Sequence, residues 1–165
     1  MVELIVSTGS NLGDRHAHLT RAVEELEAIL GLASGKSSIV ESEPWGFDGN
    51  GFLNQILVFE TDITAADCMH ELLRIEAKMG RLRAGKGYSN RSIDLDIIAY
   101  GNKIIDFPDL KVPHPLMNER RFILQPLAQI RPKWMHPIFK KSSHELLDLC
   151  LDSGTVTVYT CDTTI

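Results

Sequence analysis

The chain has 165 residues, of which 44% are hydrophobic and 24% are charged, and its formal net charge is −5. This length suits one domain with a substantial core, and the negative charge excludes the overall basic field that binds nucleic acid non-specifically. No apolar stretch approaches the roughly 18 residues of a membrane-spanning helix, and no basic leader follows Met1. We therefore expect a single domain over residues 1–165, in the cytoplasm, with neither membrane nor nucleic acid as a partner.

The three cysteines, Cys68, Cys150 and Cys161, are odd in number and lack the spacing of metal ligands. Their number and spacing give no reason to expect a disulfide framework or a zinc site. They indicate reduced thiols, as in cytosolic proteins.

Hydrophobic periodicity predicts alternating strands and helices in the first part of the chain. Asp14 and Thr64 stand where they can cap the two helices, and Pro44 halts the second strand. The order β-α-β-β-α-β is the split βαβ arrangement of ferredoxin-like folds, so we expect an α+β sandwich with a mainly antiparallel sheet. The expected elements are a strand at 2–7, a helix at 14–30, strands at 37–44 and 51–61, a helix at 64–80 and a strand at 92–100.

The remainder of the chain carries weaker patterns. Gly101 and Asn102 form a turn signal that predicts a hairpin from the 92–100 strand into "KIIDF". Residues 116–130 are expected to be partly helical, "SSHELLDLCL" has the pattern of a short capped helix, and "TVTVYT" that of a last strand. We therefore expect a C-terminal hairpin and helices beside the ferredoxin-like core.

Two aspartates interrupt the apolar strand "RSIDLDIIAY". At i and i+2 of a strand, Asp94 and Asp96 leave the same face with Cα atoms about 6.5–7 Å apart, while Leu95 and Ile97 point to the other face. Two carboxylates so close repel each other unless a cation lies between them, and oxygen ligands favour Mg²⁺ that shares its shell with substrate phosphates. A bare D-x-D also fits an exposed strand face that simply carries acids.

A cluster of positive charge precedes this strand in a protein that is negative overall. The loop "GRLRAGKGYSNR" carries Arg81, Arg83, Lys86 and Arg91 together with three glycines. Taken alone, it also fits a solvated basic loop. Together with the paired carboxylates, the guanidinium groups favour polyphosphate chemistry, so we expect a nucleoside triphosphate with Mg²⁺.

Aromatic side chains and one histidine complete the candidate set. Phe52 and Phe122 suit stacking on a flat heteroaromatic ligand, and Asn54, on the same strand face as Phe52, offers a paired donor and acceptor. For any single ring, a place in the core is the simpler interpretation. His114 lies between two prolines and close to Arg120, where a structural role in the loop and donation to a phosphate are both open.

Taken together, these segments resemble the hydroxymethyl-dihydropterin pyrophosphokinase family of folate biosynthesis. The resemblance covers about residues 1–130 and runs, in order, through "STGSNLGD", "SEPWG", "FLNQILVFET", "RIEAKMGRLR", "RSIDLDIIAYG", "VPHPLMNERRF" and "LQPLAQI". That family has a ferredoxin-like α/β fold and transfers the β,γ-pyrophosphoryl group of ATP to the hydroxymethyl group of 6-hydroxymethyl-7,8-dihydropterin, releasing AMP. The resemblance therefore implies an ATP-dependent pyrophosphokinase.

The resemblance also implies roles for individual positions. It makes Asp94 and Asp96 the ligands of two Mg²⁺ ions that bridge the ATP phosphates and the acceptor oxygen, and it adds Arg81 and Arg91 to these aspartates as catalytic residues. The positions that correspond to ATP binding are Glu76, Arg83, Tyr88, Ile97, Lys111, Val112, His114 and Arg120. Those that correspond to pterin binding are Ser42, Pro44, Trp45, Phe52, Asn54 and Phe122.

Two other functions fit parts of the pattern. A different Mg²⁺-dependent nucleotidyl or glycosyl transferase would use the same D-x-D, but it would release pyrophosphate or a nucleoside diphosphate instead of AMP. A non-catalytic, RNA-binding module of ferredoxin-like fold would need exposed aromatic and basic residues on the sheet face where this chain has acids. The pyrophosphokinase interpretation implies two small-molecule partners, ATP and the reduced pterin, and we expect a monomer.

Overall fold

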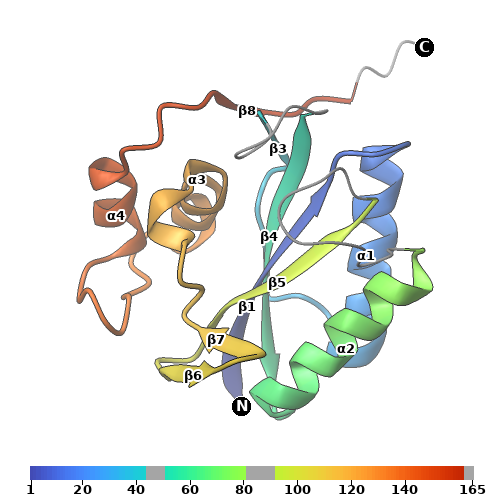
Figure 1. Ribbon diagram of the computed structural model, residues 1–165, viewed down its shortest axis with the longest axis horizontal. Coiled ribbons are helices and arrows are strands. Elements are labelled where there is room, and N and C mark those ends of the chain that lie inside the picture. Colours follow the sequence, from blue (N-terminus) through green and yellow to red (C-terminus); the bar gives the residue numbers. More distant parts are fainter. Residues whose placement is uncertain (44–50, 81–91, 162–165) are drawn as a thin grey trace.

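An antiparallel sheet lies between two layers of helices in the middle of the molecule (Figure 1). The structure is a computed structural model and describes residues 1–43, 51–80 and 92–161. Its elements in chain order are β1 (Val2–Ser10), α1 (Arg15–Leu30), β2 (Gly35–Lys36), β3 (Val40–Ser42), β4 (Phe52–Thr61), α2 (Ala65–Lys78), β5 (Asp94–Tyr100), β6 (Ile105–Phe107), β7 (Leu110–Val112), a 3-10 turn (Met117–Glu119), α3 (Arg121–Ile130), α4 (Ser143–Leu149) and β8 (Val156–Val158).

The sheet has the topology that the predicted order of elements requires. The strands β1, β3, β4 and β5, with α1 and α2 between them, give the order β-α-β-β-α-β, and they lie side by side as β5-β1-β4-β3 with antiparallel neighbours. This arrangement confirms the α+β, ferredoxin-like fold class. Beyond this core, β2 pairs with β4, and β8 extends the sheet on the far side of β3.

Each face of the sheet is covered by its own pair of helices, α1 and α2 on one side and α3 and α4 on the other (Figure 1). Because both faces are covered, the molecule has two apolar cores, which we call the α1–α2 core and the α3–α4 core. The α1–α2 core includes Leu4, Leu19, Leu72, Ile75 and Leu95. The α3–α4 core includes Ile5, Ile56, Ile98, Leu124 and Leu127.

Three helices, α1, α2 and α4, begin where their capping residues predict. The side chains of Asp14, Thr64 and Ser142 each accept a hydrogen bond from the backbone N–H three residues further on, at 3.1, 3.2 and 3.1 Å. Such an acceptor satisfies one of the four N–H groups that have no partner within the helix. The three predicted helix starts are therefore confirmed. Within the described ranges, no helix is long and apolar enough to cross a membrane.

The predicted hairpin from the strand β5 into "KIIDF" is wrong. Gly101, at φ 56°, turns the chain, but β6 pairs with β7 in a separate two-stranded sheet instead of with β5. Phe107 pairs with Leu110, so Pro108 and Asp109 form a two-residue loop between them. This tight loop, in which proline pre-sets the backbone for a turn, aligns β6 with β7 and competes with the pairing to β5.

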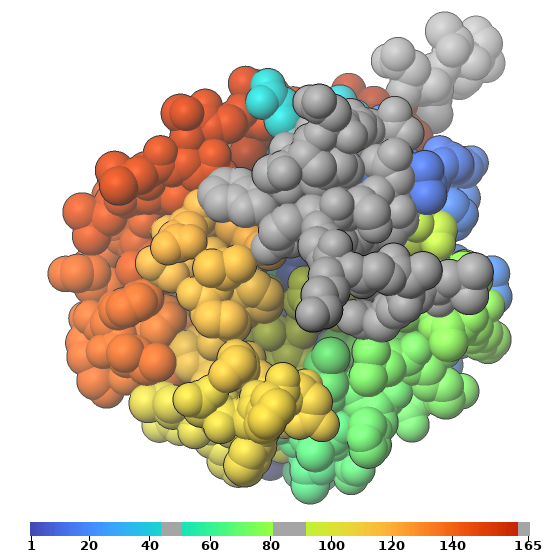
Figure 2. Space-filling model, in the orientation of Figure 1, coloured from blue at the N-terminus to red at the C-terminus, as the bar shows by residue number. Residues whose placement is uncertain are grey.

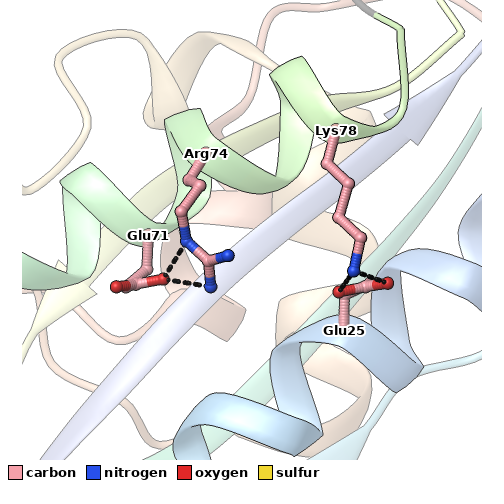
Figure 3. A network of polar contacts seen from close by, with 4 residues as sticks. All are labelled: Glu25, Glu71, Arg74 and Lys78. Carbon is pink, nitrogen blue, oxygen red and sulfur yellow. Dashed lines mark hydrogen bonds and ion pairs between the residues drawn. The ribbon is translucent and has the colours of Figure 1, made fainter.

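Exposed ion pairs lie on the outer side of α1 and α2 (Figure 3). Lys78 Nζ on α2 lies 2.8 Å from Glu25 Oε1 on α1, and the hydrogen bond between them lowers the pKa of Glu25. Arg74 Nη2 lies 2.7 Å from Glu71 Oε2, within α2. Because water and salt screen exposed pairs, they contribute little beside the buried contacts of the same helices.

The packing of α2 predicts a large difference between a buried and an exposed substitution on this helix. Ile75→Ala is expected to lower the free energy of unfolding by about 2–5 kcal/mol, because the fully buried side chain leaves a cavity. Lys78→Gln is the matched control, since it removes only the exposed pair with Glu25, and its unfolding midpoint should stay close to that of the wild type. Urea denaturation followed by circular dichroism compares them. Equal stability of the two variants would contradict the burial of this face of α2.

Candidate functional site

The first half of β5 presents its two aspartates to one face of the sheet and the apolar residues that alternate with them to the other. Leu95 and Ile97 are 0% and 4% exposed, and both belong to the α1–α2 core. Asp94 and Asp96 alternate with them along the strand and therefore face the α3 side. This confirms the alternation expected from the sequence and places the carboxylates on the opposite side of the sheet from α1 and α2.

A β-bulge ends this alternation just beyond the aspartates. Ile97 pairs with Val6 of β1, but Ala99 pairs with the preceding residue, Ile5, so the register shifts by one residue at Ile98. Ile98 and Ala99 consequently both join the α3–α4 core. The bulge lets the second half of β5 fill this core and confines its polar face to the first half.

A buried carboxylate holds β5 from its outer edge. Glu76, on α2, is 2% exposed, and its Oε1 accepts a hydrogen bond from the backbone N of Leu95 at 3.1 Å. β5 is the end strand of the sheet, where backbone groups that point outward find no strand partner and need another acceptor. Glu76 therefore ties α2 to the strand that carries Asp94 and Asp96.

His114 is anchored to β5 in a defined orientation. Its backbone N donates to Ile98 O at 2.9 Å, and its Nδ1 accepts from Leu116 N at 3.1 Å. The neutral ring therefore carries its proton on Nε2, where it can donate to an anion. Burial, followed by the positive charge of Arg120, lowers the pKa of His114 to about 4, against an opposing effect of Asp94. The charges of Arg120 and Asp94 thus both affect the protonation of His114, in opposite directions.

A cavity of about 220 Å³ at the outer edge of the sheet brings four of the candidate residues together, because Asp96 and Ile97 reach it from opposite faces of the end strand β5, beside α2 and the β6–β7 hairpin. In Figure 2 the hairpin (yellow) lies against α2 (green) at the molecular surface. The cavity joins apolar walls to two carboxylates, those of Asp96 and Asp109, an ammonium and an imidazole, a combination that suits a nucleotide bound with a cation. The candidate residues that line it are Asp96, Ile97, Lys111 and His114. Val112, a fifth candidate, is 2% exposed, and its side chain belongs to the α1–α2 core.

The start of α3 brings Arg120 and Phe122 to the same side of the sheet. Arg120 immediately precedes the helix and is 6% exposed, and its guanidinium carbon lies 5.8 Å from the centre of the Phe122 ring. Phe122 is half-buried against the α3–α4 core. Since the charge of Arg120 also acts on His114, this arginine is near both the expected pterin-side ring and the expected nucleotide-side histidine.

Asn54, which is 5% exposed, is held on the α3 face of the sheet by three neighbours. Its Nδ2 donates to Thr8 O at 3.4 Å, and its Oδ1 accepts from Ser42 Oγ at 3.4 Å. Beneath it lies Gly9, where an added Cβ would stand 2.7 Å from Asn54 Nδ2 and 3.7 Å from a ring carbon of Phe52. Gly9 is not among the residues predicted from the sequence, although a glycine within a strand is a signal of close approach. Ser42, Phe52 and Asn54 therefore come together as predicted, over a glycine.

Six of the candidate residues lie outside the residues that the structure describes. Their predicted roles in ATP binding, pterin binding and catalysis stay predictions. They are Pro44, Trp45, Arg81, Arg83, Tyr88 and Arg91.

The carboxylates of Asp94 and Asp96 suit a metal ion that binds together with a substrate. Within residues 1–43, 51–80 and 92–161, no group of three or more His, Cys, Asp and Glu side chains is arranged to hold a metal. Two carboxylates on one strand face, Asp94 and Asp96, are too few for a resident ion. They fit Mg²⁺, which commonly takes one or two protein carboxylates and completes its shell with phosphate oxygens and water.

Comparison with known proteins points to one family. Residues 5–132 match the family model of 7,8-dihydro-6-hydroxymethylpterin-pyrophosphokinase (HPPK). The chain is 36% identical over 146 residues to a 2-amino-4-hydroxy-6-hydroxymethyldihydropteridine pyrophosphokinase from Aquifex aeolicus, an alignment that covers 88% of this chain and 90% of that protein. A protein of the same name from Porphyromonas gingivalis is 37% identical over 141 residues, which are 83% of this chain and 95% of that one.

Solved structures share the fold at much lower sequence identity. A crystal structure of an HPPK-DHPS in complex with substrates has a TM-score of 0.73 at 15% identity over 90% of this chain, and the wild-type HPPK-DHPS of Plasmodium falciparum has a TM-score of 0.72 at 15% identity. This chain spans 43% and 44% of those two longer chains. The likeness therefore concerns the fold of one part of each of them.

The environment of His114 predicts a pH dependence of stability. Its pKa in the folded protein, about 4, lies below the ordinary histidine value of 6.5, so between these pH values the unfolded chain binds a proton that the folded protein does not. Stability should therefore fall as the pH falls through this window, by up to about 3 kcal/mol from this group.

His114→Asn is the variant that tests it, because its Oδ1 can still accept from Leu116 N but does not titrate. Free energies of unfolding measured from pH 7 to pH 4 in the presence of a metal chelator should converge for wild type and variant at low pH. Parallel curves would contradict the assignment of a depressed pKa to His114.

Proposed function

Because the chain belongs to the 7,8-dihydro-6-hydroxymethylpterin-pyrophosphokinase family, we infer that it catalyses the reaction of that family. It transfers pyrophosphate from ATP to the hydroxymethyl group of 6-hydroxymethyl-7,8-dihydropterin in folate biosynthesis, and it releases AMP. The observation that carries this conclusion is the match over residues 5–132, a range that contains every candidate site residue. The cavity that brings Asp96, Ile97, Lys111 and His114 together is its geometric support.

We propose that Asp94 and Asp96 together hold two Mg²⁺ ions with the phosphates of ATP. The family uses ATP and generally needs Mg²⁺. The common face of the two carboxylates on β5, and the place of Asp96 in the 220 Å³ cavity, support the assignment. When bound, such ions offset the phosphate charge and act as Lewis acids toward the reacting oxygens.

We propose the same cavity as the nucleotide site. Ile97 supplies part of its apolar wall, and Lys111 and His114 supply an ammonium and an imidazole N–H for phosphate oxygens. Arg120 adds a nearly buried positive charge beside them. The roles of Arg81, Arg83, Tyr88 and Arg91 in this site rest on the family resemblance.

The pterin is proposed to bind over Asn54, with the rings of Phe52 and Phe122 as stacking partners. Asn54 pairs with Gly9 of β1, and Gly9 pairs with Asp94 of β5, so the three residues form one row across the sheet. With strands about 4.8 Å apart, Asn54 and Asp94 are separated by about 10 Å along this row. A pterin bound over the first can direct its hydroxymethyl group toward phosphates held at the second.

This arrangement supports an in-line displacement. The hydroxymethyl oxygen forms a bond to the β-phosphorus as the bond from that phosphorus to the α,β-bridging oxygen breaks, so AMP leaves with the bridging oxygen. The alcohol proton passes to solvent. Because Nδ1 of His114 already accepts from Leu116 N and Nε2 carries the proton, this histidine acts as a donor to phosphate and not as the base. The rate enhancement then comes from the positioning of the two substrates and from stabilisation of the negative charge in the transition state.

We further propose that the protein acts as a monomer in the cytoplasm, on small molecules. One chain supplies both halves of the proposed site, since the pterin side comes from β3, β4 and α3 and the ATP side from β5 and β7. Its cysteines, Cys68, Cys150 and Cys161, are free thiols, as in a reducing compartment.

The metal assignment predicts that Asp96→Asn lowers kcat by about a hundredfold or more, because one Lewis-acid site loses its ligand charge. The assay combines ATP, Mg²⁺ and 6-hydroxymethyl-7,8-dihydropterin, and it measures AMP and the pyrophosphorylated pterin. Asp62→Asn is the control, since this exposed carboxylate pairs with the Met1 amino group. Its activity should equal that of the wild type.

An Asp96→Asn variant with wild-type turnover and an unchanged Mg²⁺ dependence would overturn the metal assignment. Release of pyrophosphate or a nucleoside diphosphate in place of AMP would instead indicate another Mg²⁺-dependent transferase.

A further inference from the structure

The segment at residues 150–159 reaches both walls of the proposed pterin site. It leaves the end of α4, crosses the N-terminus of α3 and joins the sheet as β8 beside β3 (Figure 1). It lies beyond the residues that the family model matches, which end at residue 132. Hydrophobic alternation predicts its strand, but local sequence assigns it no function.

Its first attachment is to the start of α3. Asp152 Oδ2 accepts a hydrogen bond from the backbone N of Arg121 at 3.1 Å. In return, Arg121 Nε donates to the carbonyl oxygen of Asp152 at 3.0 Å, and Arg121 Nη2 donates to that of Cys150 at 3.2 Å. Asp152 Oδ1 also accepts from Gly154 N at 2.9 Å, which closes the turn that carries the carboxylate. The carboxylate and the guanidinium thus hold the segment and the helix together.

This attachment gives α3 a cap that its own sequence lacks. The residue at the N-cap position is Arg120, whose side chain makes no capping hydrogen bond. The carboxylate of Asp152 satisfies an N–H of the first turn from 31 residues further along the chain, and its charge suits the positive end of the helix dipole. Asp152 therefore fixes where α3 begins, one residue before Phe122.

The second attachment is to the strand that carries Ser42. Val156 of β8 pairs with Ser42 of β3, which pairs in turn with Phe52 of β4. The pairing continues beyond β8, where Tyr159 N donates to Ile39 O at 2.8 Å. Gln125 of α3 donates from Nε2 to Val156 O at 3.3 Å, so helix and strand meet through the segment.

We propose that Asp152 is a positioning residue for pterin binding, which fixes the spacing between the wall formed by Ser42, Phe52 and Asn54 and the wall formed by Phe122. This proposal rests on the function proposed above. A flat ligand held between two rings is sensitive to their spacing, because stacking energy is lost when the rings stand too far apart or too close together. The 150–159 segment joins the supports of the two walls and so limits their relative movement.

The nucleotide cavity has different supports. It is walled by β5, α2 and the β6–β7 hairpin, whereas the segment is attached to β3 and, through Arg121, to the start of α3. Among the described residues proposed for ATP binding, only Arg120 lies at the start of α3, and its backbone N is held by Met117 O and not by the segment. Loss of the Asp152 cap should therefore weaken pterin binding much more than ATP binding. A purely structural role would lower the stability of the protein without favouring one ligand over the other.

The test uses the full chain with Asp152→Ala and Asp152→Asn, since the asparagine keeps an oxygen that can accept from Arg121 N. Matched controls are Asp148→Ala and Asp148→Asn on α4, where the carboxylate is 68% exposed and lies 3.6 Å from His144 Nε2. Calorimetry measures the Kd of 6-hydroxymethyl-7,8-dihydropterin on protein saturated with Mg²⁺ and a non-hydrolysable ATP analogue. It also measures the Kd of the analogue itself, and thermal unfolding reports the folded fraction.

Asp152→Ala is expected to raise the Kd for the pterin about tenfold, and Asp152→Asn about threefold, as for the loss and the weakening of a charged cap. The Kd for the analogue should change by less than about twofold, and the Asp148 variants should match the wild type. An unchanged pterin Kd in a folded Asp152→Ala variant would overturn the proposal, as would equal losses for both ligands. Should this variant unfold at the assay temperature, the same two criteria apply to Asp152→Asn.

Measurements on the wild-type protein distinguish failure of this proposal from failure of the function on which it rests. A wild-type protein that binds neither ATP nor the pterin would overturn the proposed function and the positioning role with it. A wild type that produces AMP, together with Asp152 variants of unchanged pterin affinity, would overturn the positioning role alone.

Discussion

The hydrogen bond from the backbone of Leu95 to the buried carboxylate of Glu76 decides how β5 is placed, and the site depends on that placement. An end strand has backbone donors on its outer side, and a buried carboxylate is costly without donors of its own. Here the N–H of Leu95 and the carboxylate of Glu76 satisfy each other, and α2 is thereby joined to the strand. With Leu95 directed into the α1–α2 core, Asp94 and Asp96 have only the opposite face of the sheet available.

Both negatively and positively charged side chains lie on that face, as the binding of a metal-bound polyphosphate requires. Asp94, one of the two carboxylates, stands at one end of a row that crosses β1 at Gly9 and reaches Asn54 on β4. Arg120 and the neutral His114 lie on the same side and affect the charge balance there. Since pyrophosphoryl transfer needs ATP and an acceptor alcohol in line, the row explains why one antiparallel sheet can support both ligands.

Local periodicity was sufficient to predict the parts of this site that lie within single elements. Alternation along a strand placed Asp94 opposite Leu95, and a cap at Asp14 marked the start of α1. Contacts between distant residues carry no such local signal, which is why the bond between Glu76 and Leu95 and the cap of α3 by Asp152 were not predicted. The β6–β7 hairpin was mispredicted because two turn signals competed, and only the whole fold decides between them.

The most direct measurement of the central claim locates the metal. With Mn²⁺ in place of Mg²⁺ and a non-hydrolysable ATP analogue bound, paramagnetic broadening of backbone amide signals in NMR spectra reports distance from the ion. The proposed placement of the metal on β5 predicts the strongest broadening at Asp94 and Asp96 and at their partners Gly9 and Ser7 on β1. Broadening centred on the helix α1, on the other side of the sheet, would contradict it.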